Sequence, residues 1–140
     1  EGVHRGAAVP PPAVPNGEAT LVASRAFARG ERERFDRINE RLSVLRKKGP
    51  VAVWGAGAKG VTYLNLLDPR CERVDCVIDI NPRKQGRFLP GCGHPIVAPS
   101  ALAARGVASV IVMNPNYLSE IAVEARRHAP QIEVLPDGEP

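Results

Sequence analysis

The segment VAVWGAGAKG at residues 51–60 constrains the fold of this chain more than any other part of the sequence. Four apolar residues precede Gly55, Gly57 and Gly60, which have the spacing G-x-G-x-x-G. In a strand–turn–helix unit, the first glycine permits a tight turn, the second lets backbone approach a phosphate, and the third lets the helix pack against the strand. Amides at the helix N-terminus then face an anion. The segment therefore predicts a Rossmann-like unit, with a strand over 51–54 and a helix over 58–67.

Strand-like and helix-like patterns alternate along the rest of the chain. Apolar runs predict strands over 73–78, 96–97, 109–113 and 132–135, and helical spacing predicts helices over 99–105 and 117–128. Such alternation is typical of parallel strands joined by crossover connections. The fold class that we expect is α/β, a Rossmann-like three-layer domain with a mainly parallel sheet, preceded by an N-terminal helix and a proline-rich arm.

The first 50 residues are predicted to form an arm followed by a helix. Residues 1–19 are rich in proline and glycine, and residues 20–29 fit a short helix or a covering segment. Apolar residues at helical spacing predict a helix over 31–48, which Gly49 and Pro50 end. We assign residues 1–30 to a flexible arm or linker and residues 31–140 to one Rossmann-like domain. Since the chain begins EGVHRGAAV without a methionine, we expect it to be a piece of a longer protein.

Charge and composition disfavour several classes of partner. The chain of 140 residues carries a net charge of +4, and its basic residues crowd residues 25–48. Acidic residues are interleaved with them, so a solvated helix face is favoured over a surface for an anionic partner. Aromatic residues make up 4% and no nucleic-acid reader motif is present, so we expect no nucleic acid partner. No apolar run is long enough to span a membrane, and no membrane partner is expected.

The three cysteines do not form a metal-binding pattern. Cys71, Cys76 and Cys92 contain no C-x-x-C pair, and their odd number indicates reduced thiols in a cytoplasmic protein. A metal site made by these cysteines and His94 is disfavoured, because the spacing is loose and Cys76 falls inside a predicted strand. We therefore predict no metal ligands.

Polar residues follow three of the predicted strands. Ligands of open α/β sheets bind outside the carboxyl ends of the strands, where the glycine turn, the Asp79–Asn81 segment and the Asn114–Tyr117 segment should meet. The long loop over 81–95 is expected to hang over them, since loops of this length are usually functional. This convergence predicts a ligand site at the carboxyl edge of the sheet.

The roles of individual residues at this edge stay open at the level of sequence. Lys59 fits either a contact to a phosphate or carboxylate or a solvent-facing side chain. Asp79, 19 residues after Gly60, fits either a ribose or sugar contact or a cap of the turn that follows its strand. Lys84 fits either a phosphate contact or a solvated loop. His94 is expected to be a hydrogen-bonded loop histidine, and Glu120 a carboxylate in the first turn of a helix.

Three segments together resemble a known family. VWGAGAKGVTYLNLL, DINPRKQGRFLPGCGHPIVAPSAL and VIVMNPNYLSEI are similar to the C-terminal domain of bacterial SAM-dependent C-methyltransferases of the sugar C-methyltransferase type. The resemblance covers residues 31–135. It implies a parent protein with a zinc-binding module, a SAM-binding domain, and a C-terminal Rossmann-like domain that covers the active site and helps to hold a nucleotide-linked sugar.

The resemblance also implies residue roles and partners. The substrate-binding residues that it implies are Gly55, Gly57, Lys59, Gly60, Asp79, Asn81, Lys84, Asn114, Asn116 and Tyr117. The Asn-Pro-Asn sequence at 114–116 departs from the Trp-Asn pair of many relatives. No catalytic residue and no cofactor are expected in this chain, because SAM and the catalytic base belong to the missing domains. The expected partners are the SAM-binding domain of the same parent protein and a nucleotide-linked sugar or similar small molecule.

Two other functions remain open. The glycine spacing together with Asp79 also fits an NAD(P)-binding oxidoreductase domain. A Rossmann shell that serves as an interaction domain without a ligand is the third possibility, with the arginine-rich helix over 31–48 as its contact. The sequence contains no Ser/His/Asp set, no Walker lysine–serine pair and no HExxH motif, so a self-contained catalytic apparatus is not predicted.

Overall fold

The computed structural model describes residues 17–138, and most of the predicted proline-rich arm lies outside the described residues. Helix α1 (Gly17–Lys48) is one continuous helix, where the sequence predicts a separate segment over 20–29 and a helix over 31–48. Gly30 lies inside this helix, since one glycine costs only about 1 kcal/mol in a helix interior. The chain divides into two compact units, Glu1–Ile38 and Asn39–Pro140, and the second contains the sheet.

Five parallel strands form the sheet of the second unit. They are β1 (Val51–Trp54), β2 (Cys76–Ile78), β3 (Ile96–Val97), β4 (Ser109–Val112) and β5 (Glu133–Pro136), in the spatial order β3-β2-β1-β4-β5. In the register, Val53 of β1 lies between Val77 of β2 and Ile111 of β4. The predicted mainly parallel sheet is confirmed. The chain leaves β1 toward β2 and β3 and then returns to β4 on the other side of β1, which creates a switch in strand order beside β1.

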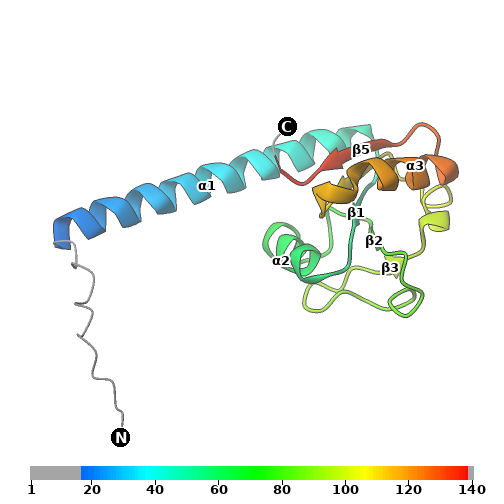
Figure 1. The fold of residues 1–140 in the computed structure, drawn as a ribbon, viewed down its shortest axis with the longest axis horizontal. Coiled ribbons are helices and arrows are strands. Elements are labelled where there is room, and N and C mark those ends of the chain that lie inside the picture. Colours follow the sequence, from blue (N-terminus) through cyan, green and yellow to red (C-terminus); the bar gives the residue numbers. More distant parts are fainter. Residues whose placement is uncertain (1–16, 139–140) are drawn as a thin grey trace, which may run out of the picture. The chain divides into compact units, whose positions relative to one another are not determined.

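Helices cover both faces of the sheet, which confirms the predicted three layers. On one face, Val51 and Val53 pack with Leu42 and Leu45 of α1 and with Leu64 of α2 (Ala58–Leu67). On the other face, Ala52 and Trp54 pack with Ala125 of α3 (Leu118–His128) and with Leu102, which follows the short helix η1 (Pro99–Ala101). Figure 1 shows the strands lying between α2 and α3. Alternate residues of β1 are buried on opposite faces, so the whole strand is apolar.

Two predicted elements are shorter in the structure. The strand predicted over 73–78 begins only at Cys76, because the amides of Arg73 and Val74 donate to the carboxylate of Asp68 instead of pairing with a strand. The helix predicted over 99–105 is the single turn η1, followed by turns that end at Gly106, whose φ is 64°. Before β2, hydrogen bonds to the side chain of Asp68 replace strand pairing, and after η1 a glycine with a positive φ ends the helical turns.

The loop over residues 81–95 is folded back onto the domain. Leu89 and Cys92 are buried in the core cluster that contains α2, and Leu89 donates its amide to the carbonyl oxygen of His94. The side chain of Asn65 on α2 donates to the carbonyl oxygen of Pro90, at 3.0 Å. These contacts hold the loop against α2.

Candidate functional site

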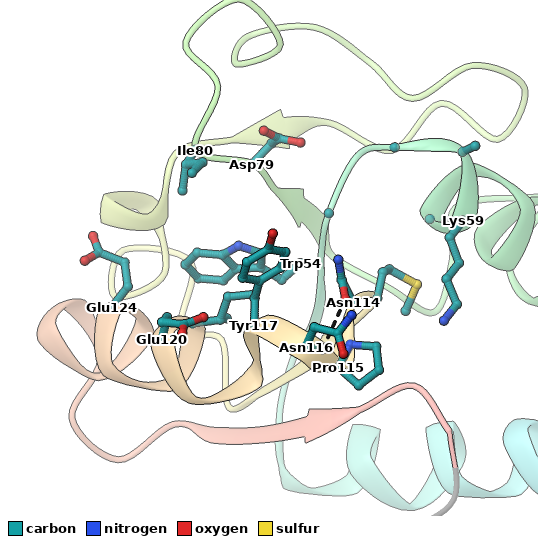
Figure 2. A pocket seen from close by; sticks show the side chains of 16 residues that line it. Trp54, Lys59, Asp79, Ile80, Asn114, Pro115, Asn116, Tyr117, Glu120 and Glu124 are labelled. Carbon is teal, nitrogen blue, oxygen red and sulfur yellow. Dashed lines mark hydrogen bonds between the residues drawn. The ribbon is translucent and has the colours of Figure 1, made fainter.

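A cavity of about 880 Å³ opens at the carboxyl edge of β1, β2 and β4 (Figure 2). It is lined by the glycine turn after β1, the two residues that follow β2, the segment after β4 and the first turns of α3. The cavity therefore lies at the switch in strand order, where open α/β sheets bind their ligands. Its lining residues are Trp54, Gly55, Gly57, Ala58, Lys59, Gly60, Asp79, Ile80, Met113, Asn114, Pro115, Asn116, Tyr117, Glu120, Ile121 and Glu124.

The glycine turn brings the N-terminus of α2 to this cavity. Gly55 has a φ of 122°, in the region that favours glycine, and its amide donates to the carbonyl oxygen of Ile78 at 2.8 Å. A Cβ on Gly60 would lie 2.1 Å from the carbonyl oxygen of Gly55, so only glycine lets α2 approach β1 this closely. Gly57 is the N-cap of α2, and no side chain caps the helix. The first-turn amides of α2 thus lack a side-chain acceptor, which is the arrangement that binds anions.

Asp79 holds the turn in place. Its Oδ2 accepts the amide of Ala56 at 3.0 Å, and its Oδ1 accepts the amide of Asn81 at 2.9 Å. The Nζ atom of Lys84 lies 3.9 Å from Oδ2. The carboxylate therefore caps the turn after β2, which is one of its two predicted roles, and also ties that turn to the glycine turn. Contact with a ribose or sugar remains a prediction.

Lys59 forms an ion pair inside the domain. Its Nζ lies 3.0 Å from Oδ2 of Asp137, and the lysine side chain is 59% exposed while the aspartate side chain is 10% exposed. The side chain of Lys59 is thus accessible to solvent, whereas that of Asp137 is largely buried.

The segment after β4 forms the wall opposite the glycine turn. Asn114 caps the short helix η2 (Pro115–Tyr117) through its Oδ1, which accepts the amide of Asn116 at 3.1 Å. Tyr117 is 57% exposed and lies over Trp54 in the view of Figure 2. Trp54, which is 6% exposed, ends β1.

Eight of the ten predicted substrate-binding residues line the cavity, and two do not. Asn81 and Lys84 are absent from its lining; Oδ1 of Asn81 accepts the amide of Arg83 instead, at 3.0 Å. The loop over 81–95 contributes no lining residue, so the expectation that it hangs over the site is wrong for this cavity. Its buried Leu89 holds it against α2.

Several lining residues are not among those predicted from the sequence. Trp54 is predicted only as part of a strand, although the residue that precedes the glycine turn must lie at the strand's carboxyl end. Glu120 is predicted only as a first-turn carboxylate, and Glu124 carries no predicted role. The two glutamates are four residues apart, so they lie on one face of the predicted helix, and this helix follows the Asn-Pro-Asn segment directly. The sequence therefore does contain a signal that places both near the site. Met113 is predicted as the last residue of the strand over 109–113, so, like Trp54, it must lie at a strand's carboxyl end. Ile80 is a single apolar residue after β2 and carries no such signal.

His94 lies away from the cavity, in a buried pair with Asp68. Its Nε2 lies 2.7 Å from Oδ2 of Asp68, and His94 is fully buried. Burial by itself would raise the pKa of Asp68, but hydrogen bonds from the amide of Val74, the His94 ring and the amides of Glu72 and Arg73 lower it below its usual value. The pair is therefore a structural support for the 81–95 loop, as predicted for a hydrogen-bonded loop histidine.

Within residues 17–138, no cluster of three histidine, cysteine or acidic residues is arranged to hold a metal ion. No helix in this part of the chain is long and apolar enough to cross a membrane. The described cysteines, Cys71, Cys76 and Cys92, are all free thiols.

The fold is that of a Rossmann-like α/β domain, with a cavity at the carboxyl edge of its sheet. A family model described as the C-methyltransferase C-terminal domain matches residues 17–131. The chain belongs to this family, which confirms the resemblance noted in the sequence.

The similarity to individual proteins is low. No curated protein matches the chain. Among solved structures, a Rex-family repressor, RSP, matches with 14% identity and a TM-score of 0.46, covering 62% of this chain and 51% of the repressor. The structure of RSP with beta-NADH matches with 15% identity and a TM-score of 0.45, covering 62% of this chain and 52% of that protein. The chain thus spans about half the length of these structures.

Proposed function

We propose that this chain is the substrate-binding domain that covers the active site of a SAM-dependent C-methyltransferase acting on a nucleotide-linked sugar. The observation that carries the proposal is the cavity at the carboxyl edge of the sheet. Its volume of about 880 Å³ falls in the range of small-molecule sites, roughly 300–1,000 Å³. Its lining combines apolar side chains with a few polar groups, which is the usual composition of such sites.

The diphosphate of the substrate would bind at the N-terminus of α2. The first-turn amides there have no side-chain acceptor, and Lys59 would exchange Asp137 for a phosphate oxygen. Asn114 and Asn116 offer amide groups on the opposite wall. Trp54 and Tyr117 supply flat apolar surfaces for the ring systems of the ligand. Asn81 and Lys84 would act only on a part of the substrate that extends beyond the cavity.

The methyl donor and the catalytic base would come from another domain of the same parent protein. C-methylation needs a base within hydrogen-bond reach of the proton that it removes. The two histidines in the described part of the chain do not offer one, because His94 is buried against Asp68 and His128 lies 3.2 Å from Glu124. This domain would supply substrate positioning alone. We propose that residues 1–30 link it to the preceding domain and that residues 31–140 form the Rossmann-like module.

Titration calorimetry of the purified chain tests this proposal with three ligands, dTDP-glucose, SAM and NADH. We expect binding of dTDP-glucose and none of SAM. Trp54 is the single tryptophan of the chain and lines the cavity, so its fluorescence should change on binding. Tight binding of NADH with none of dTDP-glucose would instead support the NAD(P)-binding function. Absence of binding by all three would support an interaction domain without a ligand.

A further inference from the structure

The cavity has two ends of opposite polarity. At one end lie the N-terminus of α2 and Lys59, which favour an anion. At the other end lie Glu120 and Glu124, on the first two turns of α3. Figure 2 shows Lys59 and the two glutamates on opposite sides of Trp54 and Tyr117. A ligand with one anionic part and one part rich in hydrogen-bond donors would therefore bind in a single direction.

The acidic residues of the cavity differ in what they already bind. Each oxygen of Asp79 accepts a backbone amide, from Ala56 and from Asn81. Glu124 lies 3.3 Å from Arg127 and 3.2 Å from His128. Glu120 is exposed and, among residues 17–138, has no hydrogen-bond or ion-pair partner. Glu120 is thus the carboxylate that is ready to accept hydrogen bonds from a ligand.

Building on the proposed function, we propose that Glu120 is the residue that recognises the sugar portion of the nucleotide-linked substrate, through the sugar hydroxyl groups. A carboxylate only accepts hydrogen bonds, and a hexose offers several O–H donors. A thymine or uracil edge presents one N–H donor between two carbonyl acceptors, which Glu120 and Glu124 would repel. The phosphates are also repelled from this end and drawn to the end at α2. Asp79, in contrast, shapes the turn and is not the sugar-reading carboxylate.

The start of α3 places Glu120 at the cavity. Helix α3 begins directly after the η2 turn, whose cap Asn114 fixes the direction in which the helix leaves the sheet. Glu120 lies in the first turn of α3, beside the cavity-lining Tyr117 and Ile121. A sugar that stacks on Tyr117 or Trp54 through its C–H face would bring its hydroxyl groups to the helix side of the cavity.

The test compares dTDP-glucose with dTDP, by calorimetry and Trp54 fluorescence, in the wild-type chain and in Glu120→Ala and Glu120→Gln. We expect Glu120→Ala to weaken dTDP-glucose binding by about 30-fold, since hydrogen bonds to a charged group are worth about 1.5–3 kcal/mol. Glu120→Gln retains one acceptor and should fall between Ala and wild type. Binding of dTDP should change by less than about twofold, because the variants remove only the hydrogen bonds to the sugar. The thermal midpoint should fall by only a few degrees, because Glu120 is exposed and stabilises the domain only through the dipole of α3, by about 0.3–1 kcal/mol.

Glu72→Ala serves as the matched control, because Glu72 is an exposed glutamate that does not line this cavity. It should bind both ligands as the wild type does. The inference is overturned if Glu120→Ala binds dTDP-glucose normally, or if it loses dTDP and dTDP-glucose equally. Failure of the wild-type chain to bind dTDP-glucose overturns the proposed function and, with it, this inference. Normal wild-type binding with an unaffected Glu120→Ala variant overturns the inference alone.

Discussion

Replacing Gly60 with alanine tests the close approach of α2 to β1. A Cβ at this position would lie 2.1 Å from the carbonyl oxygen of Gly55, with Cγ of Met113 at 3.6 Å. The atom in the way belongs to the backbone, so it cannot rotate away as a side-chain end would. For an ordinary contact, α2 must withdraw from the end of β1 by about 1 Å or more.

The expected cost of Gly60→Ala follows from this displacement. Overpacking of a filled interior costs about 1–3 kcal/mol, and a backbone clash lies at the upper end, so we expect about 3 kcal/mol. For a domain of this size, that loss lowers the thermal midpoint by roughly 10–20 °C. Thermal unfolding followed by circular dichroism, together with urea titration at 25 °C, would measure both quantities.

Gly57→Ala is the control for this experiment. Gly57 lies three residues earlier in the same turn, and a Cβ there would meet no atom within 4 Å. Its replacement should cost less than about 1 kcal/mol, which reflects only the weaker preference for alanine at an N-cap. If the two variants unfold within about 2 °C of each other, the close approach at Gly60 does not limit the packing of α2, and the reasoning is refuted.

Three further predictions follow from buried and paired groups. Asp68→Asn should destabilise the domain by about 3 kcal/mol at pH 7, because an amide cannot accept all of the hydrogen bonds that the carboxylate takes from the amides of Glu72, Arg73 and Val74 and from the His94 ring. Since the folded state lowers the pKa of Asp68, its stabilisation is complete above an unfolded pKa of about 3.9 and is lost as the pH falls through the folded value. Urea titrations from pH 7 to pH 2 should therefore show a steeper acid loss in wild type than in Asp68→Asn, and parallel curves would contradict the assignment. Lys59→Met should lower stability by about 1 kcal/mol, because the Lys59 end of the pair is exposed while the largely buried carboxylate of Asp137 loses its partner, and should weaken dTDP binding by about tenfold in calorimetry; unchanged binding would remove Lys59 from the phosphate contacts. Burial raises the pKa of Cys76 to about 12, so iodoacetamide at pH 8 should leave Cys76 unmodified by mass spectrometry until the domain unfolds, and rapid labelling of the native chain would disprove its burial.

Much of the fold can be predicted from local sequence patterns. The apolar run of residues 51–54 and the glycine spacing after it predict the correct strand, turn and helix, because each feature depends on neighbouring residues. The predicted start of β2 is three residues too early. The reason is that Asp68, at the end of α2, takes the amides of Arg73 and Val74, and no periodicity reveals such a side-chain acceptor.

The candidate site is predictable in outline for a similar reason. The rule that ligands bind at the carboxyl ends of parallel strands brings together the glycine turn, Asp79 and Asn114 from the order of the predicted strands. The rule does not say which way a long loop folds. The loop over 81–95 has the glycines and prolines of a lid, but Leu89 and His94 are buried on the α2 side and hold it away from the cavity.

The glycine spacing by itself determined that a strand, a tight turn and a helix follow one another, because only glycine fits a positive φ at Gly55 and a close approach at Gly60. Sequence similarity also determined the family. Only the tertiary structure decided which carboxylates are available to a ligand. Asp79 is bound to amides from two different loops, which meet because β1 and β2 are neighbours, whereas Glu120 faces the cavity without a partner among the described residues. The bond between Asp79 and Ala56 joins residues far apart in the chain, so it depends on strand order and is absent from any local pattern, unlike the local bond to Asn81.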